Sequence, residues 1–240
     1  MTGNDKIILA LDVSTEGDAI ELVNELKDHV GAFKVGMELF NSTGPKIFES
    51  LRYAGAGRVF YDSKFHDIPN TVAGAARAAA RMGIWMFNVH APGGSAMMRA
   101  AADAASEEAD KLGVERPLIL AVTVLTSISA EVLRHELSVP ILLENQVTHL
   151  ASLAQASGLD GVVASPHEIS QVKSACGPQF LVVTPGVRPA WAAANDQARI
   201  MTPSAAVQAG ADYLVIGRAI TGASDRVSAA KRIIEELEAI

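Results

Sequence analysis

The chain has 240 residues, of which 49% are hydrophobic and 20% are charged, as is typical of a soluble globular protein with a sizeable core. Its net charge of −7, without any basic tract, argues against a nucleic-acid partner, and no apolar run approaches the length of a membrane span. The single cysteine, Cys176, excludes an intramolecular disulfide and a metal cluster of several cysteines. No signal segment is recognisable at the N-terminus, so the cytoplasm is the expected location.

Short apolar runs alternate with longer helical patterns along the whole sequence. The expected strands are Ile7–Leu11, Ala32–Val35, Val59–Tyr61, Met86–Val89, Leu118–Val124, Gly161–Val163, Phe180–Val183 and Tyr213–Ile216. The expected helices are Asp18–His29, Gly44–Tyr53, Thr71–Arg81, Ala96–Leu112, Glu144–Ala156, Pro166–Ala175, Ser204–Ala209 and Ala223–Glu238. Eight strand–helix units in 240 residues favour an α/β fold of the closed (β/α)₈ TIM-barrel type over an open doubly wound sheet. No linker-like segment divides the chain, so we expect one domain over residues 1–240.

In such a barrel, active-site residues lie where the strands end. The first strand ends at Asp12, the second carries Lys34, and the third runs into Asp62 and Lys64. Because alternate residues of a strand share a face, Asp62 and Lys64 are expected to point the same way. By the same alternation Asp12 and Lys34 should face away from the helices, which leaves Ile7, Leu9 and Leu11 on the helix side. Each charge alone is more simply a strand end facing water, and an isolated D-x-K is most often a surface ion pair. Together, four charges of alternating sign indicate a site at one mouth of the barrel.

Arginines follow the last two strands. The seventh strand leads into Thr184-Pro185-Gly186-Val187-Arg188, and the eighth into Ile216-Gly217-Arg218. The loops after these strands are a recurrent phosphate site in barrels, where arginine supplies a planar fork of donors. Gln197, in the long turn-rich loop, could add a neutral donor. An isolated Gly–Arg pair is more often a structural turn, but at this place in the fold we expect phosphate binding.

No metal site is expected. The six histidines lack H-x-x-x-H or H-E-x-x-H spacing, and Lys34 and Lys64 would oppose an acidic metal cage. There is also no Ser/His/Asp arrangement of the kind that nucleophilic catalysis uses.

Several segments resemble the bacterial orotidine 5′-monophosphate decarboxylase family. They are, in order, ILALD, FKVGMELF, DSKFHDIPNT, NVHAPGG, VTVLTS, TPGVRP and YLVIGRAI, and the resemblance extends roughly from Lys6 to Glu236. The D-x-K-x-x-D signature alone marks a wider superfamily that includes metal-dependent sugar-phosphate enzymes, whereas the extension HDIPNT is more specific. Ser63 stands where many members carry an apolar residue. Its parity directs it away from Asp62 and Lys64, so we expect little effect on the chemistry.

The resemblance implies a reaction without cofactors, in which orotidine 5′-monophosphate loses CO₂ from C6 and yields uridine 5′-monophosphate, the last step of pyrimidine nucleotide synthesis. By this resemblance Lys64 stabilises the negative charge at C6 and delivers the proton, and Asp62 faces the departing carboxylate. Lys34 separates the carboxylates, and Asp12 and Lys34 contact the ribose hydroxyls. Thr126 contacts the pyrimidine. The phosphate is held by Arg188, Gln197, Gly217 and Arg218.

The family also implies a homodimer. Asp67, Ile68 and Thr71 would then act in the neighbouring subunit's site, and the loop Val187–Thr202 would close over the phosphate. Two other readings of the residues stay open. One is a metal-dependent sugar-phosphate aldolase or decarboxylase on the same scaffold, which a chelator would inhibit. The other is a nucleotide-binding barrel without activity, which would be expected to lack Lys34, Asp62 or Lys64, yet all three are present.

Overall fold

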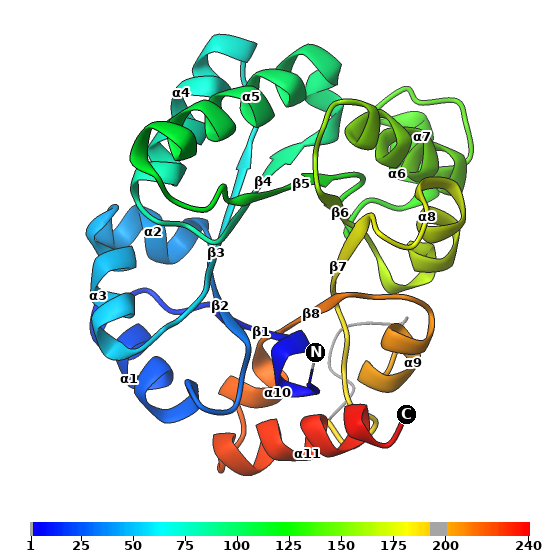
Figure 1. The fold of residues 1–240 in the computed structure, drawn as a ribbon. Coiled ribbons are helices and arrows are strands. Elements are labelled where there is room, and N and C mark those ends of the chain that lie inside the picture. The colour runs from blue at the N-terminus through cyan, green and yellow to red at the C-terminus, as the bar shows by residue number, and fades with distance from the viewer. Residues whose placement is uncertain (1, 193–200) are drawn as a thin grey trace.

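Parallel strands pair in chain order around a closed barrel in the computed structural model, which describes residues 2–192 and 201–240 (Figure 1). Each strand pairs with the next, and the last pairs back with the first through Ile7↔Leu214 and its neighbours. The strands are β1 (Ile7–Leu11), β2 (Ala32–Val35), β3 (Val59–Phe65), β4 (Met86–His90), β5 (Leu118–Val122), β6 (Gly161–Val163), β7 (Leu181–Pro185) and β8 (Tyr213–Ile216). The predicted (β/α)₈ barrel is therefore confirmed.

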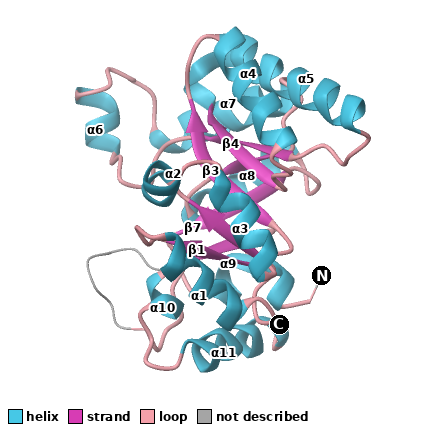
Figure 2. Cartoon of the chain, turned by 90° about the vertical axis from the view of Figure 1, so that its left-hand side faces the viewer, coloured by secondary structure: helices cyan, strands magenta, loops and turns pink. Residues whose placement is uncertain are grey.

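Helices surround the barrel on its outside, as the side view also shows (Figure 2). They are α1 (Glu16–Leu26), α2 (Met37–Thr43), α3 (Lys46–Ala54), α4 (Pro69–Arg81), α5 (Gly94–Leu112), α6 (Ala130–His135), α7 (Leu143–Ala156), α8 (Ile169–Cys176), α9 (Pro203–Gln208), α10 (Arg218–Thr221) and α11 (Arg226–Glu238). Short 3-10 turns occur at Asn4–Lys6, Ala91–Gly93 and Pro166–Glu168. Among the described residues, no helix has the length and apolar character that a membrane crossing requires.

Local sequence signals explain where several helices begin and end. The hydroxyl of Thr15 accepts the Asp18 amide at the start of α1, and the Asp225 carboxylate accepts the Ser228 amide at the start of α11. Pro69 occupies the first turn of α4, where its missing N–H costs no helical hydrogen bond. The left-handed Gly113 ends α5. These caps fix the lengths of the helices and thereby the loops that carry the site.

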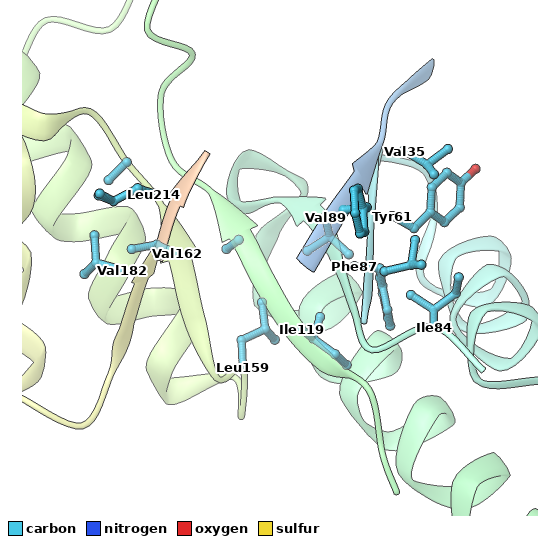
Figure 3. Packing of buried hydrophobic residues seen from close by; sticks show 14 of the residues in the cluster. Val35, Tyr61, Ile84, Phe87, Val89, Ile119, Leu159, Val162, Val182 and Leu214 are labelled. Carbon is cyan, nitrogen blue, oxygen red and sulfur yellow. The ribbon is translucent and has the colours of Figure 1, made fainter. Parts of the chain in front are cut away.

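The core has two layers, which follow from strand alternation. The outer layer packs strands against helices and includes Ile7, Leu9 and Leu11 of β1, and Figure 3 shows a part of it around Phe87 and Ile119. The inner layer fills the barrel and comprises Ile8, Ala32, Phe60, Met86, Leu120, Val183 and Tyr213. The predicted orientation of the β1 residues is thus confirmed. Burying each large apolar side chain contributes about 1.5–3 kcal/mol, so the barrel is a rigid support for its mouth.

The observed elements differ from the predicted ones at the mouth. Strand β3 extends to Phe65, β5 ends already at Val122, and β7 covers Leu181–Pro185. The short helices α2, α6 and α10 were not expected. Seven, six and four residues are too few to display a helical hydrophobic period.

Candidate active site

Four charged side chains form one chain of ionic contacts at the carboxyl ends of β1, β2 and β3. Lys34 Nζ lies 3.2 Å from Asp12 Oδ1 and 3.5 Å from Asp62 Oδ2. Lys64 Nζ lies 2.6 Å from Asp62 Oδ1. The sign of the charge therefore alternates along the series from Asp12 through Lys34 and Asp62 to Lys64. The structure brings together the four residues that the sequence placed at one mouth.

The centre of this series is shielded from water, and its edge is open. The side chains of Lys34 and Asp62 are 10% and 16% exposed, whereas that of Asp12 is 62% exposed. Burial by itself would raise the pKa of Asp62, but Lys34, Lys64 and hydrogen bonds from Lys64 and Asn88 outweigh it, so the pKa lies below its ordinary value. Asp62 is consequently an anion at neutral pH, held between two ammonium groups.

Strand β3 is irregular where it carries these residues. Its register against β4 shifts between Tyr61 and Phe65, and the backbone of Lys64 has a φ of 50°, in the left-handed region. Asp62 and Lys64 do meet, as predicted, but through this irregularity and not through plain alternation alone. The Ser63 hydroxyl donates to the Asn88 carbonyl oxygen over 2.8 Å. The Ser63 hydroxyl thus binds the neighbouring strand β4.

Asn88 on β4 belongs to the same cluster, although it was not among the predicted site residues. Its side chain is fully buried, and Nδ2 donates to Asp62 Oδ1 over 2.7 Å. Its Oδ1 accepts the backbone N–H of Lys64, also over 2.7 Å. The sequence did contain a signal. Asn88 is the polar residue of the expected strand Met86–Val89, and it shares parity with Met86, which faces the barrel interior.

Two histidines lie next to this cluster. The rings of His66 and His90 are 5.6 Å apart between centroids. Burial, with smaller effects of His66 and Lys64, lowers the pKa of His90 below its ordinary value, so this ring is neutral at pH 7. In the described part of the chain, no group of three or more His, Cys, Asp or Glu side chains has an arrangement that would hold a metal ion.

Arg188 and Arg218 line one pocket of about 310 Å³ beyond the ends of β7 and β8. Other lining residues are Trp191, Ala192, Ala219, Gly222 and Ala223. Gly217 connects this pocket to the charged series, because a Cβ on it would lie 3.5 Å from Asp12 Oδ2. The Arg188 amide donates to the Met201 carbonyl oxygen over 3.0 Å, which joins the two described ends of the long loop. Gln197 lies outside the described residues, as do all of residues 193–200, which make up half of the predicted closing loop.

The other predicted residues follow β3 and β5 in the chain. Asp67 and Ile68 precede α4 and Thr71 lies in its first turn, and all three side chains are exposed. Thr126 is exposed in the loop after β5. Asp67 accepts the adjacent amide of Ile68 over 2.6 Å, and within the described ranges no ion pair joins it to a lysine of the series.

A carboxylate fixed between two cations suits a reaction in which negative charge develops near an ammonium group. Such charges are oriented by the fold before any substrate binds, so they need no reorganisation during the reaction. The arginine pocket beside Gly217 offers a place for an anionic group of the same ligand. The geometry therefore combines two ammonium groups around one carboxylate with a nearby pocket that two arginines line.

Comparisons with known proteins agree with this geometry. Residues 5–233 match the profile of the family described as "Orotidine 5'-phosphate decarboxylase / HUMPS family". The chain is 55% identical over 239 residues to an orotidine 5′-phosphate decarboxylase of Syntrophomonas wolfei, covering 99% of this chain and 100% of the relative. It is 54% identical over 240 residues to that of Moorella thermoacetica, covering 100% and 95%. The solved orotidine 5′-phosphate decarboxylase of Lactobacillus acidophilus superposes with a TM-score of 0.85 at 41% identity, covering 96% and 98%.

Proposed function

Because this chain belongs to the orotidine 5′-phosphate decarboxylase / HUMPS family, we propose that it is a carboxy-lyase that converts orotidine 5′-monophosphate to uridine 5′-monophosphate and CO₂. The observation that carries the proposal is the pair of lysines that brackets Asp62, with Lys64 Nζ at 2.6 Å and Lys34 Nζ at 3.5 Å. Full-length relatives with identities of 55% and 54% support the decarboxylase over other members of the wider superfamily.

The chemical step breaks the bond between C6 and the carboxylate carbon. CO₂ leaves without its bonding electron pair, which stays on C6 as a carbanion-like centre. The ammonium of Lys64 stabilises this charge and then transfers a proton to C6, after which the neutral amine regains a proton from water. No external oxidant, reductant or electron sink enters this balance, and in our proposal the reaction uses no cofactor.

Asp62 and Lys34 prepare the lysine for this step. Asp62 holds the Lys64 ammonium by their ionic contact and presents a negative charge to the substrate carboxylate. Lys34 lies between the carboxylates of Asp12 and Asp62, within 3.5 Å of both, and so keeps the two anions in place. In our proposal Asp12 and Lys34 also bind the ribose hydroxyls, since Asp12 is the most exposed member of the series.

Binding of the remainder of the nucleotide is assigned to the loops. Arg188, Gly217 and Arg218, together with Gln197, would hold the phosphate, and the shared pocket of the two arginines supports this role. Thr126, exposed in the loop after β5, would contact the pyrimidine. Binding energy from the phosphate, which does not react, can then lower the barrier at C6.

A homodimer completes the proposed site. Asp67, Ile68 and Thr71 would reach the active site of the neighbouring subunit. Their exposure supports this, and so does the exposed apolar surface of Ile68 and Met37, which are 67% and 56% exposed. In our proposal the activity lies in the cytoplasm.

The test is incubation with orotidine 5′-monophosphate in the presence of excess chelator, while the absorbance of the orotate ring is followed. We expect the absorbance to fall at the same rate with and without chelator, and the product to comigrate with uridine 5′-monophosphate. A constant absorbance would refute the proposal. Inhibition by chelator, with recovery on adding a divalent cation, would instead favour the metal-dependent sugar-phosphate enzyme, which a parallel assay with sugar phosphates would detect.

A further inference from the structure

We propose that Asn88 is a positioning residue that aims Lys64 and Asp62 at the reacting carbon, an inference that rests on the proposed decarboxylation. The amide of Asn88 is fully buried on β4 and contacts both members of the pair at once. Its oxygen binds the backbone of Lys64, and its nitrogen binds the side chain of Asp62. One side chain therefore fixes both the backbone position from which the Lys64 side chain extends and the position of the carboxylate that binds its ammonium group.

The hydrogen bond from the Lys64 backbone to Asn88 stabilises the unusual conformation of Lys64. A φ of 50° is disfavoured for a residue with a Cβ, so the surrounding structure must hold it. The register shift of β3 leaves Lys64 outside the regular ladder with β4, and its N–H points to Asn88 Oδ1 at 2.7 Å. Without this acceptor the amide would have no partner among the described residues, a cost that would favour another backbone conformation.

The carboxylate contact sets the direction of Asp62. Its Oδ1 receives two hydrogen bonds, from Lys64 Nζ at 2.6 Å and from Asn88 Nδ2 at 2.7 Å. Its Oδ2 faces Lys34 Nζ at 3.5 Å. A neutral donor on Oδ1 keeps the carboxylate from rotating when the Lys64 ammonium moves toward the substrate. The donor adds no charge, so Lys64 remains the nearest cation that can give a proton.

The two partners also fix the orientation of the amide. Asp62 at neutral pH accepts hydrogen bonds only, and a backbone N–H donates only. The nitrogen of Asn88 must therefore face Asp62, and its oxygen must face Lys64. An aspartate at this position keeps the acceptor for Lys64 but loses the donor, and a leucine of similar size loses both. These two substitutions separate the contributions of the two contacts.

The experiment compares Asn88→Asp, Asn88→Leu and the matched control Ser63→Ala with the wild type. The control removes the remaining side-chain hydrogen bond between this segment and Asn88, and it leaves both contacts of the Asn88 side chain in place. We expect kcat to fall about 10- to 100-fold in both Asn88 variants, with KM within about threefold of the wild type. We expect Ser63→Ala to keep kcat within about threefold.

Two further readouts distinguish positioning from a general structural role. In Asn88→Asp a second carboxylate beside Asp62 disfavours its ionisation, so the acidic limb of the kcat profile should move to higher pH. The Lys64 amide, followed by hydrogen exchange, should lose protection in Asn88→Leu and keep it in Asn88→Asp. A purely structural residue would lower the melting temperature and leave the pH profile and the kcat of the folded enzyme unchanged.

The inference is overturned if folded Asn88→Asp and Asn88→Leu retain the wild-type kcat and pH profile, or if the Lys64 amide stays protected in Asn88→Leu. If Asn88→Leu does not fold, the kcat and the pH profile of the nearly isosteric Asn88→Asp decide whether Asn88 is a positioning residue. If the wild type itself does not act on orotidine 5′-monophosphate, the proposed function fails. Hydrogen exchange at Lys64 then still decides whether Asn88 holds this backbone.

Discussion

Lys64 Nζ lies 2.6 Å from Asp62 Oδ1, an ion pair between two residues that a single residue separates in the chain. The backbone of Lys64 is left-handed there, with a φ of 50°. The strand departs from regular geometry at the point where the ammonium meets its carboxylate. Strain of this kind persists only where the surroundings enforce it, and it gathers at functional sites. In this barrel the enforcing contacts come from β4, through the side chain and backbone of Asn88.

Removing the ammonium should abolish the reaction while sparing substrate binding. For Lys64→Ala we expect turnover of orotidine 5′-monophosphate to fall at least about 10⁴-fold, because both charge stabilisation and the proton source are lost. Uridine 5′-monophosphate should still bind, as measured by calorimetry, through the arginine pocket. Lys111→Ala, which removes an exposed lysine at the end of α5, serves as the control and should keep full activity. Normal turnover by Lys64→Ala would refute the assigned role.

The sequence was sufficient to predict the barrel and its charged mouth. Alternation placed Ile7, Leu9 and Leu11 of β1 toward the helices and Lys34 toward the interior, and the structure agrees. Apolar runs and helical periods repeat in a way that only a few folds accommodate. The short helices α2, α6 and α10 escaped prediction, since tertiary contacts rather than periodicity decide segments of this length.

The finer geometry of the site was not predictable from the pattern alone. The register shift of β3 depends on how Lys64 and Asn88 hydrogen-bond across two strands, and a one-dimensional pattern does not contain that contact. Asn88 was visible as a polar residue in an apolar strand, but its two partners were not. Asp67 was readable as part of a signature, but the role that we propose for it involves a second subunit, which a single-chain pattern does not describe.

The lowered pKa of Asp62 has a consequence for stability. Its folded pKa lies below the value of about 3.9 for an unfolded aspartate, so ionised Asp62 stabilises the fold at all pH values above that figure. This contribution is lost as the pH falls from about 4 through the folded pKa. We therefore expect Asp62→Asn to be less stable than the wild type at pH 7, with a difference that shrinks toward pH 3.

Urea unfolding of both proteins at several pH values measures this difference. Asp103→Asn on α5, where the aspartate is exposed, controls for the general effect of acid. A stability gap between wild type and Asp62→Asn that is independent of pH would contradict the linkage.

The phosphate assignment predicts that Arg218 serves both the phosphate of the whole substrate and an oxyanion added to a substrate that lacks it. Arg218→Ala should lower kcat/KM at least about 100-fold, since a charge-assisted contact to the phosphate is removed. Added phosphite should activate turnover of a substrate that lacks the phosphate, and it should do so more poorly in Arg218→Ala than in the wild type. Arg52→Ala, at an exposed arginine of α3 outside the pocket, is the matched control. An unchanged kcat/KM in Arg218→Ala would remove Arg218 from the phosphate site.

Two buried threonines test how much a hydrogen bond of a buried hydroxyl contributes to the stability of the barrel. The hydroxyl of Thr184 is buried and has no hydrogen-bond partner among the described residues. Thr123, equally buried, donates to the Val163 carbonyl oxygen over 3.3 Å. Thr184→Val should therefore be neutral or stabilising by up to about 1 kcal/mol, and Thr123→Val destabilising by about 1 kcal/mol. Thermal unfolding of both variants measures the contrast, and a clear loss of stability in Thr184→Val would show that its hydroxyl has a partner.

The proposed sharing of residues between subunits can be tested by mixing two inactive variants. If Asp67 acts in the neighbouring site, Asp67→Ala and Lys64→Ala should each lack activity, because every site in either homodimer misses one group. A mixed dimer contains one site with both groups intact and one with neither. Random reassortment makes about half of the dimers mixed, so activity should recover to roughly a quarter of the wild type. Recovery measured after subunit exchange supports the shared site, whereas no recovery in a proven mixed dimer would place Asp67 in its own subunit's site.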